Sequence, residues 1–194
     1  DFDPIEKYGG VGSYINWKEG YLVVLQHPVT TEYTSSRKDV EQTLMAIHEL
    51  NLPTFWFWPN VDAGSDGTSN GIRSFRELKK PKNIHFFKNM APNDFLRLLK
   101  NSQCLIGNSS VGIRECVYLG VPVVNIGTRQ DGRHRGNNVT DVTYDKKAIV
   151  SAIKERIQNN NIVSENIYGA GNSGQIIADV LAEMELVFHK KIAY

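Results

Sequence analysis

The sequence predicts an α/β domain, in which a Rossmann-like parallel sheet carries helices on both faces. Short apolar runs, such as YLVVLQ at 21–26, are typical of central strands in a parallel sheet. Amphipathic segments with apolar residues three and four positions apart alternate with these runs. The connections between them are short, as they are in parallel α/β sheets. The predicted order of elements is therefore β-α-β-α-β-α-β-α-β-loop-β-α-α.

Each predicted element rests on a local signal. The first strand must stop before Pro28, because proline cannot donate to a sheet ladder. The aromatic run TFWFW at 54–58 favours a strand, with the tryptophans in the core. The polar stretch 60–70 has no clear period and is interpreted as a loop. The predicted strands are 21–26, 54–58, 83–87, 104–106, 121–126 and 139–142, and the predicted helices are 35–50, 72–78, 93–100, 111–119, 145–157 and 174–187.

The chain is long enough for one good-sized domain. Residues 1–20 lack a clean period and are interpreted as an irregular lead-in or the remnant of a linker. Residues 21–194 form the predicted Rossmann-like domain with its C-terminal helix. The chain begins without Met, which suggests a fragment or a trimmed product.

Composition excludes several classes of function. The 194 residues carry 22 Lys and Arg against 21 Asp and Glu, so net charge favours neither nucleic acid nor a membrane surface as a partner. No apolar run approaches the roughly 20 residues of a membrane span, and no signal peptide is expected. Cys104 and Cys116 are expected to be reduced core residues, in keeping with a cytoplasmic protein. No spacing of Cys and His suggests a metal site.

The stretch 103–139 is the leading candidate for a ligand site. Ser109 and Ser110 precede a predicted helix, whose free N–H groups and dipole favour an anion. These serines also suit simple helix capping. Gly112 in the first turn is expected to let a ligand approach the backbone. Glu115 is a costly residue in a helix packed on apolar strands unless it meets polar partners, which a ribose diol would supply. A surface glutamate that simply favours the amino-terminal half of the helix is the alternative.

Polar residues follow three further predicted strands. The loop 127–136 places three arginines between glycines and suits a phosphate, although a solvated loop with Arg–Asp pairs would have the same composition. Within it, Arg129 lies closest to the strand. His27 and Asn60 follow two other strands. Parallel strands present ligand-binding groups at their carboxyl ends, so these residues are expected to meet there.

Five motifs in the same order resemble the carboxyl-terminal half of UDP-N-acetylglucosamine 2-epimerases, and most closely the hydrolysing branch. They are HPVTT at 27–31, PNVDAGS at 59–65, GNSSVGIRE at 107–115, GVPVVNIGTRQDGR at 120–133 and IYGAGN at 167–172. The resemblance implies one half of a glycosyltransferase-B-type enzyme, in which two Rossmann-like domains enclose the substrate. It covers residues 21–187.

The resemblance also implies roles for individual residues. His27 would contact the diphosphate and is the only catalytic candidate in this chain. The other implied contacts are Asn60 near the nucleotide-sugar, Met90 offering backbone groups to uracil, Ser109 and Ser110 on the diphosphate, Glu115 on the ribose hydroxyls, and Arg129 on the phosphate or sugar.

The implied reaction is loss of UDP across C1–C2 of the sugar, followed by hydration of the glycal to release N-acetylmannosamine or a related diacetamido sugar for sialic or other nonulosonic acid synthesis. The main acids and bases would come from an amino-terminal domain that this chain lacks, so the chain alone is expected to be inactive. The expected partners are a UDP-sugar and that amino-terminal domain. The full-length protein is expected to be a homo-oligomer, and no cofactor is expected. A glycosyltransferase donor domain and a non-catalytic UDP-binding module are the alternatives.

Overall fold

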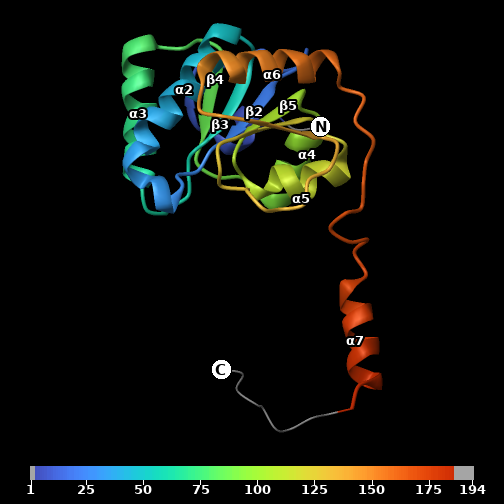
Figure 1. Ribbon diagram of the computed structural model, residues 1–194. Helices are drawn as coiled ribbons and strands as arrows, with labels where there is room; N and C mark the ends of the chain where they lie inside the picture. The colour runs from blue at the N-terminus through green and yellow to red at the C-terminus, as the bar shows by residue number, and fades with distance from the viewer. Residues whose placement is uncertain (1–2, 186–194) are drawn as a thin grey trace.

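A seven-stranded sheet organises the chain, as the computed structural model of residues 3–185 shows (Figure 1). The strand order is β1-β4-β3-β2-β5-β6-β7, and every pair is parallel except β1 with β4. The predicted α/β class is thus confirmed, with one antiparallel strand added at the edge. The strands are β1 Val11–Gly12, β2 Leu22–Leu25, β3 Thr54–Phe57, β4 Ile84–Phe87, β5 Cys104–Gly107, β6 Val123–Ile126 and β7 Val139–Val142.

Helices cover both faces of the sheet (Figure 1). The helices α2, α3 and α6 pack on one face, whereas α1, α4 and α5 pack on the other. The helices are α1 Pro4–Tyr8, α2 Ser36–Leu50, α3 Ser65–Lys79, α4 Pro92–Lys100, α5 Ser110–Leu119, α6 Lys146–Gln158 and α7 Ser173–Glu183, with a 3-10 turn η1 at Thr30–Ser35.

The sheet has a hydrophobic core on each face, and the apolar runs of the central strands contribute side chains to both. In β2, Leu22 and Val24 point into the core under α2, α3 and α6, whereas Val23 points into the core under α4 and α5. All three side chains are fully buried, as a strand covered on both faces requires. Cys104 and Cys116 are buried and carry no disulfide, as predicted.

The strand order reverses between β2 and β5. From β2 the chain moves outward through β3 and β4, then returns to the other side of β2 and continues through β5, β6 and β7. This is the order of a doubly wound Rossmann sheet. The loops that leave β2 and β5 therefore diverge to opposite faces, and the crevice between them is where such folds bind ligands.

Helix α3 begins at Ser65, seven residues before the predicted start at 72. Small residues hide its helical period. Gly67 and Gly71 face α2, where a side chain at Gly67 would overlap the hydroxyl of Ser36 and one at Gly71 would lie 2.7 Å from Val40. The polar stretch is thus helical because its glycines let two helices approach closely.

The first 20 residues contain more order than the expected irregular lead-in. Asp3 caps α1 by accepting from two backbone N–H groups, and Pro4 begins the helix. The Tyr8 hydroxyl donates to Asp94 at 2.6 Å and ties α1 to the start of α4. Strand β1 then adds to the sheet edge. A linker function for this segment remains a prediction.

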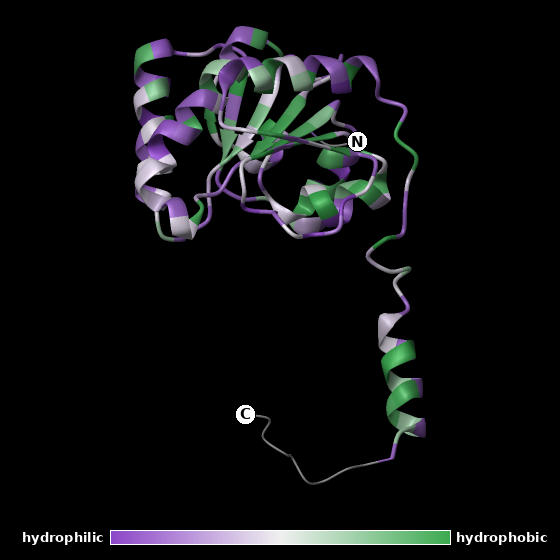
Figure 2. Cartoon of the chain, in the orientation of Figure 1, coloured by the Kyte–Doolittle hydropathy of each residue, from purple (hydrophilic) through white to green (hydrophobic). Residues whose placement is uncertain are grey.

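Helix α7 stands away from the rest of the domain (Figure 1). Its described residues are all exposed, including Ile176, Ile177, Val180 and Leu181. The hydropathy colouring shows this helix as strongly apolar (Figure 2). The prediction extended it to 187, and residues 186 and 187 lie outside the described part. No helix within residues 3–185 is long and apolar enough to span a membrane.

Candidate functional site

Polar residues from the ends of β2, β3, β5 and β6 meet at the carboxyl edge of the sheet. His27 follows β2, Asn60 follows β3, Asn108 follows β5, and Arg129 and Gln130 follow β6. Hydrogen bonds link all five residues. Because β2 and β5 flank the point where the strand order reverses, this cluster lies at the position where the fold favours a ligand.

Asn108 joins the two loops of the crevice. The backbone N–H of His27 donates to its Oδ1 at 2.7 Å, and its Nδ2 donates to the carbonyl oxygen of His27 at 2.8 Å. Its Nδ2 also lies 3.5 Å from the hydroxyl of Tyr144. The side chain is completely buried, so these bonds satisfy a group that would otherwise be costly there.

Two side chains from the loop after β6 converge on the carbonyl oxygen of Asn108. Gln130, which is buried, donates through Nε2 at 2.8 Å, and Arg129 donates through Nη1 at 3.2 Å. Arg129 forms no ion pair with a carboxylate within residues 3–185. It therefore brings an uncompensated positive charge to the start of α5.

His27 is held as a neutral imidazole with its proton on Nε2. Its Nδ1 accepts the backbone N–H of Asn60 at 3.1 Å, which leaves no place for a proton on that atom. Burial is the main cause that lowers the pKa of His27 to about 4; Arg129 lowers it further and Asp62 opposes. At neutral pH His27 can donate one hydrogen bond through Nε2, but it is not a cation.

Replacing His27 by glutamine should flatten the dependence of stability on pH. The unfolded chain protonates His27 near 6.5, whereas the folded chain does so near 4, so the unfolded state binds more protons in between. The stability gained from a neutral His27 is fully present above 6.5 and is lost as pH falls towards 4, by about 3 kcal/mol in total. Urea unfolding of both proteins at pH 7.5 and 4.5 measures the difference, and parallel losses in the two proteins would contradict the tautomer and burial described here.

Ser109 and Ser110 lie at the start of α5, as predicted. Ser109 is the N-cap, and its Oγ accepts from the N–H of Val111 at a long 3.4 Å. Both serines are half-buried. The helix start points its free N–H groups and positive dipole end into the crevice beside Arg129.

Gly112 plays a different part from the one expected. It is buried, and a side chain there would lie 2.9 Å from Val123 and 3.4 Å from Leu105. Its lack of a side chain serves the close packing of α5 on the sheet, so the prediction that it admits a ligand is wrong. The signal was misleading because a glycine in a first helical turn suits either role.

Glu115 has one carboxylate oxygen without a partner in the described chain. Its Oε1 lies 3.8 Å from Arg114, whereas its Oε2 is buried and unbonded. An unsatisfied buried carboxylate oxygen is costly, and a ligand with hydroxyl donors would remove that cost. The structure thus keeps the expected acceptor one helical turn from the start of α5.

Met90 and the remaining arginines of the loop fit the expectation only in part. Met90 lies in the turn after β4, but its N–H already donates to Oδ1 of Asn89 at 2.9 Å, which leaves its carbonyl oxygen for a ligand. Arg135 is paired with Asp141 at 2.7 Å and with Asp131 at 3.7 Å. Arg133 is exposed. The arginine-rich loop therefore contributes one arginine, Arg129, to the crevice.

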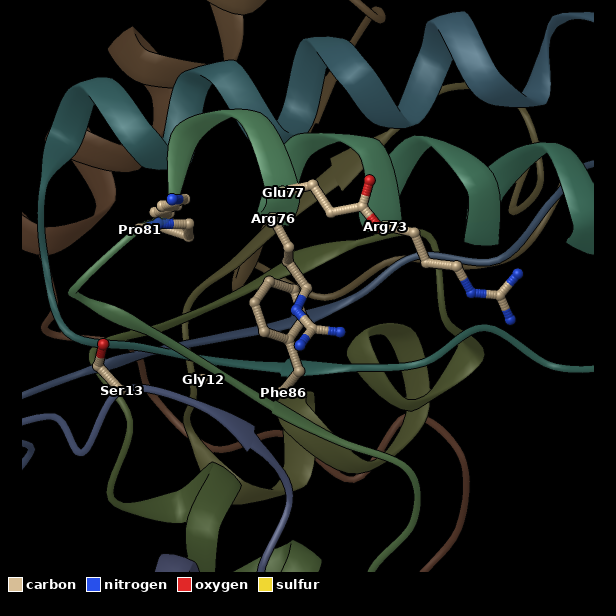
Figure 3. A pocket seen from close by; sticks show the side chains of 8 residues that line it. Gly12, Ser13, Arg73, Arg76, Glu77, Pro81 and Phe86 are labelled. Atoms are coloured by element: carbon tan, nitrogen blue, oxygen red, sulfur yellow. The ribbon is translucent and has the colours of Figure 1, made fainter.

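Hollows in the described surface lie both at this edge of the sheet and away from it. One, of about 480 Å³, opens beside Arg129, Thr128 and Asp62 at the carboxyl edge. The other, of about 310 Å³, lies between α3 and the edge formed by β1 and β4, and β3 separates that edge from β2 (Figure 3). There the guanidinium of Arg76 stacks on the ring of Phe86, 5.2 Å from its centroid. Within residues 3–185 no group of three His, Cys, Asp or Glu side chains is placed to hold a metal ion.

Sequence reasoning missed the residues that bind the loops together. Asn108, Gln130 and Tyr144 are not among the predicted site residues. The available signal was a polar residue directly after an apolar strand, since such a residue is buried only when it has partners.

The fold and crevice define a class of protein: a doubly wound α/β domain with an anion-favouring helix start at its switch point. Comparison with known proteins narrows this class. The family model for UDP-N-acetylglucosamine 2-epimerase matches residues 7–182. The chain belongs to the UDP-N-acetylglucosamine 2-epimerase family.

Individual proteins with similar sequences support membership of that family. The chain is 29% identical over 164 residues to UDP-N,N'-diacetylbacillosamine 2-epimerase (hydrolyzing) of Legionella pneumophila, which covers 84% of this chain and 43% of the relative. It is 38% identical over 135 residues to polysialic acid biosynthesis protein P7 of Escherichia coli, covering 69% and 34%. The chain thus spans less than half the length of the curated relatives it matches.

A solved structure shows the same fold. The UDP-GlcNAc 2-epimerase of Neisseria meningitidis, bound to UDP-GlcNAc, matches with a TM-score of 0.68 at 18% identity, over 85% of this chain and 45% of that one. The chain is therefore an α/β domain equivalent to half of a glycosyltransferase-B-type structure.

Proposed function

We propose that this chain is the carboxyl-terminal, nucleotide-binding domain of a hydrolysing UDP-N-acetylglucosamine 2-epimerase. One observation carries the proposal: a neutral His27, the start of α5 and Arg129, which forms no ion pair within residues 3–185, converge where the strand order reverses. N–H donors, a helix dipole and a guanidinium together suit a diphosphate. The Legionella relative is named as hydrolyzing, which supports that branch.

Each part of UDP has a candidate partner in the crevice. Ser109, Ser110 and the N–H groups of α5 would hold the diphosphate, with Arg129 as the positive charge. The ribose diol would donate to the unbonded oxygen of Glu115. The carbonyl oxygen of Met90 would accept from the N–H of uracil, and Asn60 would lie towards the sugar.

The reaction places a defined demand on His27. Removal of the C2 proton and cleavage of the bond between C1 and the UDP oxygen would give a glycal, and water would add to it to release N-acetylmannosamine or a related diacetamido sugar. With a pKa of about 4, His27 is neutral at neutral pH and does not serve as a cationic general acid. Its Nε2–H would instead stabilise the charge on the departing diphosphate by a hydrogen bond. The proton-transferring acids and bases would come from elsewhere in the full-length protein.

A second Rossmann-like domain would complete the active site. The relatives are more than twice as long as the stretch they share with this chain. Helix α7 exposes Ile176, Ile177, Val180 and Leu181, and another domain would cover such an apolar surface (Figure 2). We also propose that the full-length protein is a cytoplasmic homo-oligomer. The Escherichia coli relative, named for polysialic acid biosynthesis, supports a role in sialic or related acid synthesis.

Titration of the chain with UDP, UMP and uridine, followed by NMR, tests this function. We expect UDP to bind more tightly than UMP, and UMP more tightly than uridine, with shifts at the N–H groups of Ser109, Ser110 and Arg129. We expect no turnover of UDP-N-acetylglucosamine. Failure of UDP to shift these signals would refute the binding role, and release of N-acetylmannosamine by this chain alone would refute the division between domains.

Replacing Glu115 by alanine should weaken UDP binding by about tenfold, because a charge-assisted hydrogen bond to the ribose would be lost. Binding of pyrophosphate, which has no ribose, should not change. Calorimetric titration with both ligands measures the two effects. Glu155→Ala, which removes an exposed carboxylate of α6, is a suitable control, and equal losses for UDP and pyrophosphate in Glu115→Ala would contradict the ribose role.

A further inference from the structure

We propose that Asn108 is a positioning residue, which sets the diphosphate-binding groups of three loops in register with one another. The inference rests on the proposed binding of UDP and adds a role to a residue that itself need not touch the ligand. Asn108 lies between the last residue of β5, Gly107, and the two serines at the start of α5.

The side chain of Asn108 fixes the loop after β2. It accepts the N–H of His27 and donates to the carbonyl oxygen of the same residue, at 2.7 and 2.8 Å. Its own backbone N–H donates to the carbonyl oxygen of Leu25 at 3.2 Å. The carboxamide therefore extends the β2–β5 ladder by one more pair, beyond the point where the two strands would separate. His27 cannot move relative to Ser109 without breaking this pair.

The backbone of Asn108 fixes the loop after β6. Its carbonyl oxygen receives the Nε2 of Gln130 at 2.8 Å and the Nη1 of Arg129 at 3.2 Å. Gln130 is 1% exposed and Asn108 is 0% exposed, so both bonds at their shared oxygen are shielded from competition by water. Arg129 is thereby aimed at the start of α5, although no carboxylate of the described chain holds it.

Asn108 thus contacts the groups that would meet the diphosphate and none of those that would meet the base or ribose. His27, Arg129 and the helix start are bonded or adjacent to it. Within residues 3–185, Met90 bonds Asn89 and Glu115 pairs with Arg114, and neither forms a hydrogen bond with Asn108. A residue that merely stabilised the domain would show no such division. Loss of Asn108 should therefore disturb binding of the diphosphate and spare binding of the nucleoside.

The test compares UDP and uridine binding in Asn108→Ala by NMR titration of the 194-residue chain. We expect the dissociation constant for UDP to rise by about tenfold to thirtyfold and that for uridine to stay within about twofold. Asn83→Ala is the matched control, since Asn83 also bonds a carbonyl oxygen, that of Leu52, but at the amino-terminal edge of β4. It should change neither constant.

A double-mutant cycle with His27→Ala provides a readout that general destabilisation would not move. If Asn108 acts through His27, the double variant should bind UDP little more weakly than His27→Ala alone. Additive losses would overturn the proposal, as would an equal loss of uridine and UDP binding in Asn108→Ala. Should Asn108→Ala not fold, Gln130→Met is the second variant. It leaves the side chain of Asn108 in place and removes one hydrogen-bond donor from the backbone carbonyl oxygen of Asn108. That variant should weaken UDP by about threefold and spare uridine, and an unchanged UDP affinity would overturn the proposal. Absence of UDP binding by the unmodified chain would instead refute the proposed function.

Discussion

Replacing Arg129 by alanine is expected to weaken UDP binding by about tenfold to a hundredfold, the largest effect on binding of any single side chain in the crevice. A hydrogen bond to a charged group contributes about 1.5 to 3 kcal/mol, and no carboxylate of residues 3–185 forms an ion pair that would compete for Arg129. Because part of this energy is coulombic, the loss of UDP affinity caused by Arg129→Ala should become smaller as the salt concentration rises from about 50 mM to about 500 mM. Calorimetric titration at both salt concentrations measures it.

The same loop offers two comparisons for Arg129. Arg133→Ala removes an exposed arginine whose backbone oxygen, the acceptor for Arg135, is retained. It should leave UDP affinity unchanged. Arg129→Lys keeps the charge but loses the planar fork, so it should recover part of the affinity. If Arg129→Ala and Arg133→Ala had the same effect, the loop would be no more than a solvated surface.

Gly107→Ala should produce the largest loss of stability, on the order of 3 to 5 kcal/mol. Gly107 ends β5 with φ of 132°, a conformation that side chains rarely adopt. A methyl group there would overlap the carbonyl oxygen of Leu25, in the strand that pairs with β5. Relief would require β2 and β5 to separate at the crevice. Urea unfolding followed by circular dichroism measures the change.

Gly132→Ala separates the cost of the backbone conformation from the cost of steric overlap with a neighbouring strand. Gly132 also has a positive φ, of 75°, but nothing lies within 4 Å of the place that a side chain would take. Its replacement should therefore cost only about 1 to 2 kcal/mol, from the backbone conformation alone. A Gly107→Ala protein as stable as Gly132→Ala would show that β2 and β5 are not tightly joined at this point.

The order of elements was predictable from the sequence because each strand of the sheet is short, apolar and bounded by polar turns. The failures occurred where tertiary contacts decide the outcome. Gly67 and Gly71 belong to a helix because α2 lies against them, and no local period shows this. Val11 and Gly12 form a strand because β4 offers its free edge. Neither neighbour can be read from the residues around these positions.

The site was predictable in its placement and less so in its internal bonding. His27, Ser109 and Arg129 could be placed together because parallel strands end at the same edge. Their bonding could not be foreseen, because it depends on the side-chain directions of Asn108 and Gln130. Gly112 illustrates the limit further, since a requirement for close packing and a requirement for ligand access select the same residue.

Helix α7 has a practical consequence for work on this chain by itself. Tyr168 bonds the carbonyl oxygen of His134, so only residues 169–172 separate the domain from this helix with its exposed isoleucine, valine and leucine. In dilute solution, two copies of the chain are expected to associate through these apolar residues. The size of the particle would then depend on protein concentration and on detergent. Such self-association would reflect the exposed apolar residues of one helix and would say nothing about how whole enzymes of this family assemble.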